Sequence, residues 1–138
     1  MIVADTGAVL ALIDADDRHH RRLRGLFEQD PEVWILPWAV LPEVDYLVSE
    51  HLGARAQETL LSDLAAGNYI VEWGQESDLL RAAAICRRHR ALRVGLVDGV
   101  VIATAERLGA EAIATLDLRH FGAIEIDGHP KLLPRDLS

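Results

Sequence analysis

The sequence predicts a three-layer α/β/α domain around a mainly parallel sheet of four to five short strands. Short apolar runs alternate along the chain with longer segments of helical periodicity, as expected where helical crossovers connect parallel strands. Apolar residues make up 50% of the chain and charged residues 26%, which suits an aliphatic core and argues against disorder. Because a typical domain has about 150 residues, residues 1–138 are expected to form a single domain.

The first elements follow from short apolar runs separated by polar residues. Residues 1–4 are continuously apolar, as in a strand that is buried on both faces. Residues 7–13 continue with aliphatic side chains that suit a helix, and an arginine-rich helical stretch extends to about Gln29. A second strand is expected at 33–36, because a proline stands on either side of this apolar run.

The middle of the chain is expected to be mostly helical. Helices over 39–52 and 53–66 lead to a short third strand at 69–72. The alanine-rich segment 77–89 is expected to form a further helix, with Ser77 as its N-cap.

The last third contains the clearest helix and two further strands. Residues 96–99 lead into a helix over 100–108, whose apolar side chains share one face and which a glycine ends. Strands are expected at 112–114 and 123–126, followed by a turn at Asp127 and a short tail.

Charge and cysteine content restrict the class of protein. The chain has 14 basic and 22 acidic residues, and its net charge of -8 disfavours a surface that binds polyanions generally. Cys86 is the only cysteine, so no intrachain disulfide is possible. No apolar run approaches the roughly 18 residues of a membrane span, and the apolar opening is too short for a signal peptide. The expected location is therefore the cytoplasm, away from the membrane.

Four acidic residues lie near the ends of expected strands or the starts of helices. These are Asp5, Glu43, Asp98 and Asp117. Singly, each also suits a helix cap, a first-turn acid or a turn residue. Together they would meet at the carboxyl edge of a parallel sheet, where mutual repulsion favours a bound cation. An all-oxygen cluster suits Mg²⁺ or Mn²⁺, which can bind phosphate, activate water and stabilise a leaving oxygen.

Four sequence blocks carry a resemblance to a known family. They are IVADT at 2–6, LPEV at 41–44, GLVDGVVIATA at 95–105 and ATLDLRHF at 114–121. The chain resembles the PIN-domain family, and within it most closely the VapC ribonuclease toxins of bacterial toxin-antitoxin pairs. The likeness covers essentially the whole chain, and the third and fourth blocks are the most specific.

The resemblance implies a PIN-like fold and a metal-dependent endoribonuclease. The acidic quartet would hold Mg²⁺ or Mn²⁺, and metal-bound water would cleave RNA to leave a 5′-phosphate and a 3′-hydroxyl. Thr6 and Thr115 match positions where a hydroxyl supports the acids, although each also suits a threonine that bonds to its own backbone. A cognate antitoxin and a homodimer are also implied. Pro42 departs from the family pattern and predicts that the helix carrying Glu43 starts late or bends.

Basic residues are concentrated in two windows, at 18–24 and 87–93, with four arginines in each. Arginine matches phosphate with two hydrogen bonds, so these side chains are candidates to contact RNA. A solvated helix face is an equally good explanation for each window. The candidate RNA-binding residues are Arg18, Arg21, Arg22, Arg24 and Arg119.

Other classes fit less well. A haloacid-dehalogenase-type phosphatase needs an acid two residues after the first, where this chain has Gly7. A response-regulator receiver needs a lysine after a late strand, and the only lysine is Lys131, expected in the tail. A non-catalytic, metal-dependent RNA- or protein-binding module with the same fold stays open as the alternative. The three tryptophans are expected to be packing groups near strand ends, and Trp38 is also a candidate for a dimer surface.

Overall fold

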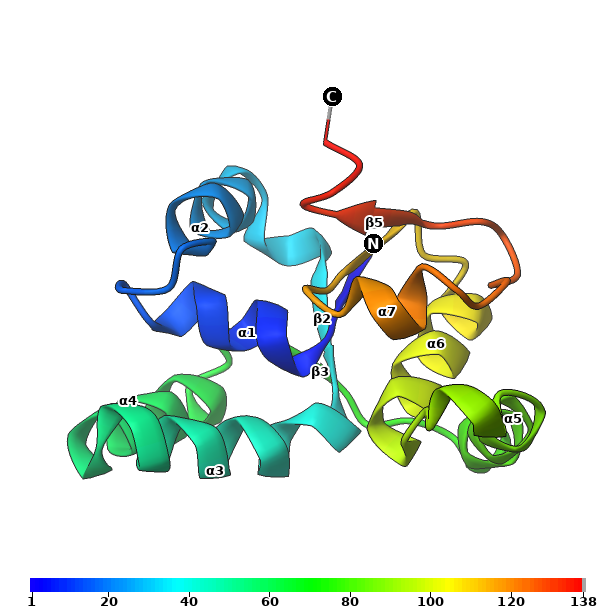
Figure 1. The fold of residues 1–138 in the computed structure, drawn as a ribbon. Helices are drawn as coiled ribbons and strands as arrows, with labels where there is room; N and C mark the ends of the chain where they lie inside the picture. Colours follow the sequence, from blue (N-terminus) through cyan, green and yellow to red (C-terminus); the bar gives the residue numbers. More distant parts are fainter. Residues whose placement is uncertain (138) are drawn as a thin grey trace.

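A computed structural model describes residues 1–137 and contains one sheet of five strands. The strands are β1 (Ile2–Ala4), β2 (Trp34–Pro37), β3 (Ile70–Glu72), β4 (Ala112–Ala114) and β5 (Lys131–Leu133). They are ordered β3-β2-β1-β4-β5, and all neighbours are parallel (Figure 1). The expected α/β class with a short-stranded parallel sheet is therefore confirmed.

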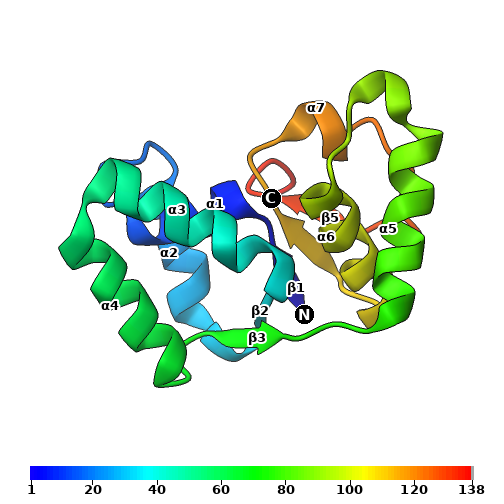
Figure 2. The same cartoon turned by 90° about the horizontal axis from the view of Figure 1, so that it is seen from below.

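Helices cover both faces of the sheet. They are α1 (Thr6–Ile13), α2 (His20–Gln29), α3 (Leu41–Leu52), α4 (Ala54–Ala65), α5 (Glu76–Arg88), α6 (Leu96–Leu108) and α7 (Leu118–Phe121). Figure 2 shows α1 to α4 on one side of the sheet and α5 to α7 on the other. The chain moves outward from β1 to β3 and then returns to β4 on the opposite side of β1. This reversal creates a switch point between β1 and β4, where open α/β sheets bind ligands.

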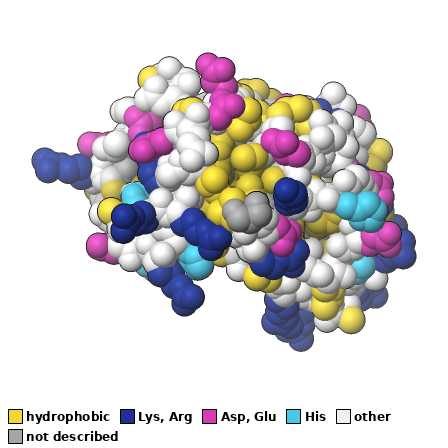
Figure 3. Space-filling view, turned by 90° about the horizontal axis from the view of Figure 1, so that it is seen from above, with side chains coloured by type: hydrophobic (Ala, Val, Ile, Leu, Met, Phe, Trp, Pro, Cys, Tyr) yellow, Lys and Arg dark blue, Asp and Glu magenta, His cyan; other side chains and the backbone are white. Residues whose placement is uncertain are grey.

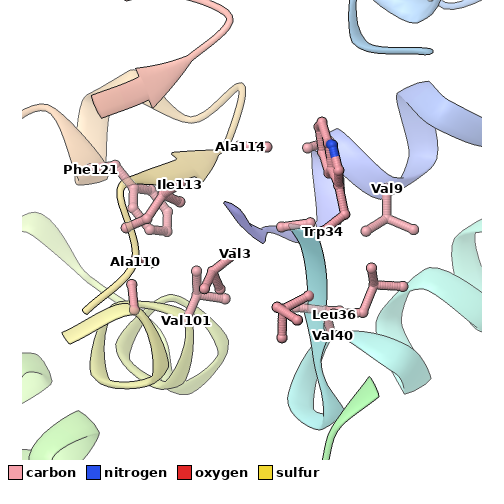
Figure 4. Close-up of a cluster of buried hydrophobic side chains, with 14 of the residues drawn as sticks. Val3, Val9, Trp34, Leu36, Val40, Val101, Ala110, Ile113, Ala114 and Phe121 are labelled. Atoms are coloured by element: carbon pink, nitrogen blue, oxygen red, sulfur yellow. The ribbon is translucent and has the colours of Figure 1, made fainter. Parts of the chain in front are cut away.

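The core is mostly aliphatic, as the composition predicts. Val3 of β1 lies beside Val101 of α6, and Leu36 of β2 lies near Val40 on the other helical side (Figure 4). All four side chains are fully buried. This packing holds the ends of the short strands in place and so fixes where the following residues begin.

The expected strand at 123–126 is wrong. Ile124 and Ile126 are buried and Glu125 between them is exposed, so the segment has the alternation of a strand without being paired. Lys131–Leu133 pairs with β4 instead, as β5. Lys131 therefore begins a strand and does not belong to an irregular tail.

Several helix starts also differ from expectation. Gln75, not Ser77, is the N-cap of α5, because its side chain and that of Asp78 form a reciprocal capping box. A 3₁₀ turn over Trp38–Val40 precedes α3, so the α-helix begins later than residue 39. Helix α6 begins earlier, at Leu96.

The tryptophans divide into one core residue and one exposed pair. Trp34 is buried, with its ring centroid 5.7 Å from that of Phe27, as a packing group should be. Trp38 and Trp73 are 50% and 68% exposed and lie with their ring centroids 5.0 Å apart. These two rings directly follow β2 and β3 and pack on each other at the surface, so they are packing groups near strand ends, as expected, but not part of the core. Within residues 1–137, no helix has the length and apolar composition needed to cross a membrane.

Candidate active site

The switch point between β1 and β4 brings Asp5 next to Thr115. Each residue directly follows its strand, so parallel pairing of the strands places them at the same sheet edge. The Thr115 hydroxyl donates a hydrogen bond of 3.0 Å to Asp5 Oδ2 and accepts one of 3.0 Å from the backbone N–H of Asp117. Figures 1 and 2 show the start of α1 beside the loop that leads into α7. Thr115 thus links two of the four acids.

Asp5 is a buried carboxyl with an unusual charge environment. It is only 5% exposed, and its side chain does not cap α1, so a capping role does not account for it. Burial raises the pKa of Asp5 to about 6, and the nearby charges of Asp98 and Asp117 add to this rise. Ionisation of Asp5 is therefore energetically unfavourable relative to a solvated aspartate, and a nearby cation would offset this cost.

Asp98 lies in the first turn of α6, where Gly95 is the N-cap. A side chain at Gly99 would place its Cβ 3.0 Å from Ala82, so a glycine there permits the close packing of α6 on α5. Burial raises the pKa of Asp98, and the charges of Asp117 and Glu43 raise it further against an opposing hydrogen bond from His120. Asp98 therefore lies close enough to Asp117 and Glu43 for their charges to raise its pKa.

Glu43 approaches from the opposite helical layer. Helix α3 begins at Leu41, so Pro42 occupies the first turn, where its missing N–H removes no helical bond. The late start expected from Pro42 is observed, and Glu43 remains in the first turn with an exposed side chain.

Asp117 completes the group and caps the short helix α7. Its Oδ1 accepts a hydrogen bond of 3.1 Å from the backbone N–H of His120, while its Oδ2 lies 2.9 Å from His120 Nδ1. The turn expected at Asp117 is thus present, and both carboxylate oxygens contact His120.

His120 is a site residue that the sequence analysis did not single out. Its Nδ1 lies 2.9 Å from Asp98 Oδ2, and its Nε2 lies 2.8 Å from the carbonyl oxygen of Leu92. Burial lowers the pKa of His120, but the hydrogen bond to Asp98 and the charge of Asp117 outweigh this and raise it overall. The signal that could have found it is its place three residues after Asp117, at a helix start.

The donor set suits a hard divalent cation. Within residues 1–137, no arginine or lysine forms an ion pair with any of the four acids, and only His120 pairs with Asp98 and Asp117. The Thr6 hydroxyl is buried without a hydrogen-bond partner in the described part of the chain. Carboxylate and hydroxyl oxygens are ligands that Mg²⁺ and Mn²⁺ accept. The residues present therefore fit such an ion.

Two of the candidate RNA-binding arginines line a cavity that also reaches Thr115. Arg18 and Arg22 line a cavity of about 390 Å³ together with Arg135 and Thr115. Figure 3 views the face that carries α2 and β5 and shows Lys and Arg side chains in dark blue on it. Basic side chains are thus available near Thr115, whose hydroxyl bonds to Asp5, although none of the four acids lines this cavity.

The remaining three arginines have different surroundings. Arg24 donates to Glu28 over 3.1 Å and lies 5.1 Å from the ring centroid of Phe27, so it is already engaged. Arg21 and Arg119 are exposed, on α2 and α7.

Fold and site together define a parallel α/β domain with a group of four carboxylates at its switch point, where His120 is the one basic side chain paired with them among residues 1–137. The PIN domain family model matches residues 2–126. The chain belongs to the PIN-domain family.

Three relatives illustrate the likeness. Ribonuclease VapC26 of Mycobacterium tuberculosis is 29% identical over 123 residues, covering 89% of this chain and 91% of that protein. The crystal structure of Mycobacterium tuberculosis VapC20, a Sarcin-Ricin loop cleaving toxin, matches with a TM-score of 0.78 and 23% identity, over 89% and 95% of the chains. A toxin-antitoxin complex from Klebsiella pneumoniae matches with a TM-score of 0.65 and 18% identity, over 90% and 92%.

Proposed function

We propose that this protein is a metal-dependent endoribonuclease toxin in which Asp5, Glu43, Asp98 and Asp117 hold Mg²⁺ or Mn²⁺. The observation that carries the proposal is the group of acids at the switch point with no arginine or lysine paired to it within residues 1–137. The similarity to ribonuclease VapC26 along most of both chains supports RNA as the substrate.

Different parts of the chain position the acids of the site. Buried Asp5 is oriented by the Thr115 hydroxyl, and Asp98 is oriented by the start of α6. Exposed Glu43 is placed to reach an ion from the solvent side. When bound, the ion would activate water and offset the charge that develops on the phosphate and leaving oxygen.

We also propose that arginines beside the acids position the RNA backbone. Arg18 and Arg22 share a cavity with Thr115, so a phosphate held there would contact the segment that follows β4 and leads to Asp117. Arg119 is exposed on α7, close in sequence to Asp117. Arg21 is a weaker candidate, and Arg24 is engaged by Glu28.

A cognate antitoxin and a second copy of this chain are the proposed protein partners, and the cytoplasm is the proposed location. The toxin-antitoxin complex among the similar structures supports the first partner. The exposed Trp38–Trp73 pair offers apolar surface for either contact. Expression of the chain alone should arrest growth, and co-expression with the neighbouring reading frame should relieve the arrest.

Incubation with structured RNA tests the nuclease directly. The wild-type chain should cleave in Mg²⁺ or Mn²⁺ and not in EDTA, while Asp5→Asn and Asp98→Asn should each lower the rate more than about 100-fold. Asp30→Asn, an exposed acid outside the site, is the matched control and should cleave normally. Full activity in both site variants would overturn the proposal. Metal-dependent RNA binding without cleavage would favour the non-catalytic binding module instead.

A further inference from the structure

His120 occupies the position between the two acids Asp98 and Asp117. Its Nδ1 is 2.9 Å from one oxygen of each carboxylate, so the ring bridges α6 and α7. Within the described residues, these three side chains are the group whose ligand atoms lie close enough to share a metal ion, within 4.8 Å of one another. His120 is therefore placed where a cation joining the two acids would also contact it.

The other ring nitrogen fixes how His120 presents Nδ1. Nε2 lies 2.8 Å from the Leu92 carbonyl oxygen, and a carbonyl can only accept, so Nε2 carries a proton. Nδ1 donates a proton to the two carboxylates when the ring is charged, and a cation bound between the acids would displace that proton and face the Nδ1 lone pair. A histidine that binds metal through one nitrogen typically donates its other N–H to a carbonyl or carboxylate, which fixes its tautomer.

We propose that His120 Nδ1 is a nitrogen ligand of the ion held by Asp98 and Asp117, an inference that rests on the proposed metal-dependent function. The separations support it. Adjacent ligands of an octahedral ion with bonds of about 2.1 Å lie about 3 Å apart. The observed 2.9 Å from Nδ1 to each carboxylate oxygen matches that spacing.

A nitrogen ligand changes which ion the site prefers. Carboxylates alone accept Mg²⁺ readily, whereas imidazole is a ligand of transition metals and is a poor partner for Mg²⁺. A set with two carboxylates and one imidazole therefore selects Mn²⁺ over Mg²⁺ more strongly than the four acids would. His120 is in this sense a residue that determines metal specificity.

Pulsed electron paramagnetic resonance of the full chain loaded with Mn²⁺ alone tests the proposal without an activity assay. The wild-type spectrum should show modulation from a directly bound ¹⁴N nucleus, and growth with ¹⁵N-labelled histidine should change it to the ¹⁵N pattern. The labelled wild type needs no mutation, so the result does not depend on whether a variant folds.

Two variants locate the nitrogen among the six histidines. His120→Asn should remove the modulation and weaken Mn²⁺ binding about 10- to 100-fold by calorimetry, with a smaller loss for Mg²⁺. His51→Asn, an exposed histidine at the end of α3, is the matched control and should keep both signals.

The outcomes separate this inference from the proposed function. Tight Mn²⁺ binding without nitrogen modulation in the wild type would overturn His120 as a ligand and leave the acidic metal site standing; the ring would then be only a positively charged partner of the acids. Absence of Mn²⁺ binding would overturn both.

Discussion

Asp5 and Asp78 are equally buried acids with opposite surroundings. Each is 5% exposed. Asp78 accepts two hydrogen bonds from Arg107, of 2.8 and 3.0 Å, and Arg107 also donates to Glu72 over 2.8 Å. Among residues 1–137, the one side-chain hydrogen bond to the Asp5 carboxylate comes from the Thr115 hydroxyl. Arg107 therefore neutralises buried Asp78, whereas no arginine or lysine among the described residues pairs with buried Asp5.

The two acidic groups lie at opposite ends of one helix. Asp98 is in the first turn of α6 and Arg107 in its last turn, about 14 Å apart along the helix axis. Both placements agree with the helix dipole. At the Arg107 end, the ion pairs join α6 to α5 and β3, so their role is to hold elements together. At the Asp98 end, four acids have only His120 as a basic partner among the described residues, and their repulsion lowers stability, as expected where a ligand supplies the missing charge.

Removing the counter-charge from Asp78 should have the largest effect on stability. Arg107→Met keeps most of the side-chain volume but leaves Asp78 and Glu72 without their cation, so the free energy of unfolding should fall by about 3 kcal/mol. Urea denaturation measures this loss. Arg55→Met, at an exposed position on α4, is the control. A loss below about 1 kcal/mol would mean that the paired cluster contributes little.

Supplying a cation to the unpaired acids should have the next largest effect. At a Mn²⁺ concentration 100 times its Kd, binding should add about 2.7 kcal/mol to the free energy of unfolding. Thermal denaturation should show a higher Tm in the wild type and none of this shift in Asp98→Asn. An unchanged wild-type Tm at saturating Mn²⁺ would mean that the acids at the Asp98 end of α6 do not bind the ion.

Removing one charge from the unpaired group should stabilise the metal-free chain. The pKa of Asp5 is about 6 in the folded state against an ordinary 3.8, so the folded chain holds a proton more tightly. Stability of the wild type in EDTA should therefore fall as pH rises from about 4 through 6. Asp5→Asn should weaken this dependence, leaving the part that comes from Asp98 and His120, and raise the free energy of unfolding by about 1–2 kcal/mol at pH 7.5.

Urea denaturation of both chains at pH 4.5 and pH 7.5 measures this pH effect. Asp30→Asn should follow the wild type, because that acid is exposed. An Asp5→Asn chain less stable than the wild type at pH 7.5 would show that the carboxylate is satisfied in the metal-free fold.

Local sequence patterns were sufficient for most of the fold and for placing the acids. Asp5 follows an apolar run and Asp98 opens a helix, so each position could be inferred from its immediate neighbours. Parallel pairing of β1 with β4 then brought Asp5 beside Thr115, as the rule for strand ends predicts.

Features that depend on distant residues could not be predicted this way. Ile124 and Ile126 alternate with Glu125 as a strand would, but β4 had one free edge and Lys131–Leu133 occupied it. His120 meets Asp98 across 22 residues of chain, and Arg107 meets Asp78 across 29. Such contacts depend on how helices pack; the spacing of His120 from Asp117 marks the residue as a neighbour of that acid, but no short-range spacing indicates its contact with Asp98.

Paired and unpaired charges also occur side by side among the arginines of α2, where the smallest effect is expected, on the salt dependence of RNA binding. Arg22 lines the cavity next to Thr115, whereas Arg24, two residues along the same helix, is bound to Glu28. In an Asp98→Asn background that does not cleave, Arg22→Gln should lower the slope of log affinity for RNA against log salt by about one unit. Arg24→Gln, which removes the same formal charge, should leave the slope nearly unchanged, because Glu28 already neutralises it. Filter binding over a range of salt concentrations measures both slopes. Equal changes would mean that α2 acts on RNA through its total charge and not through the cavity that Arg22 and Thr115 line.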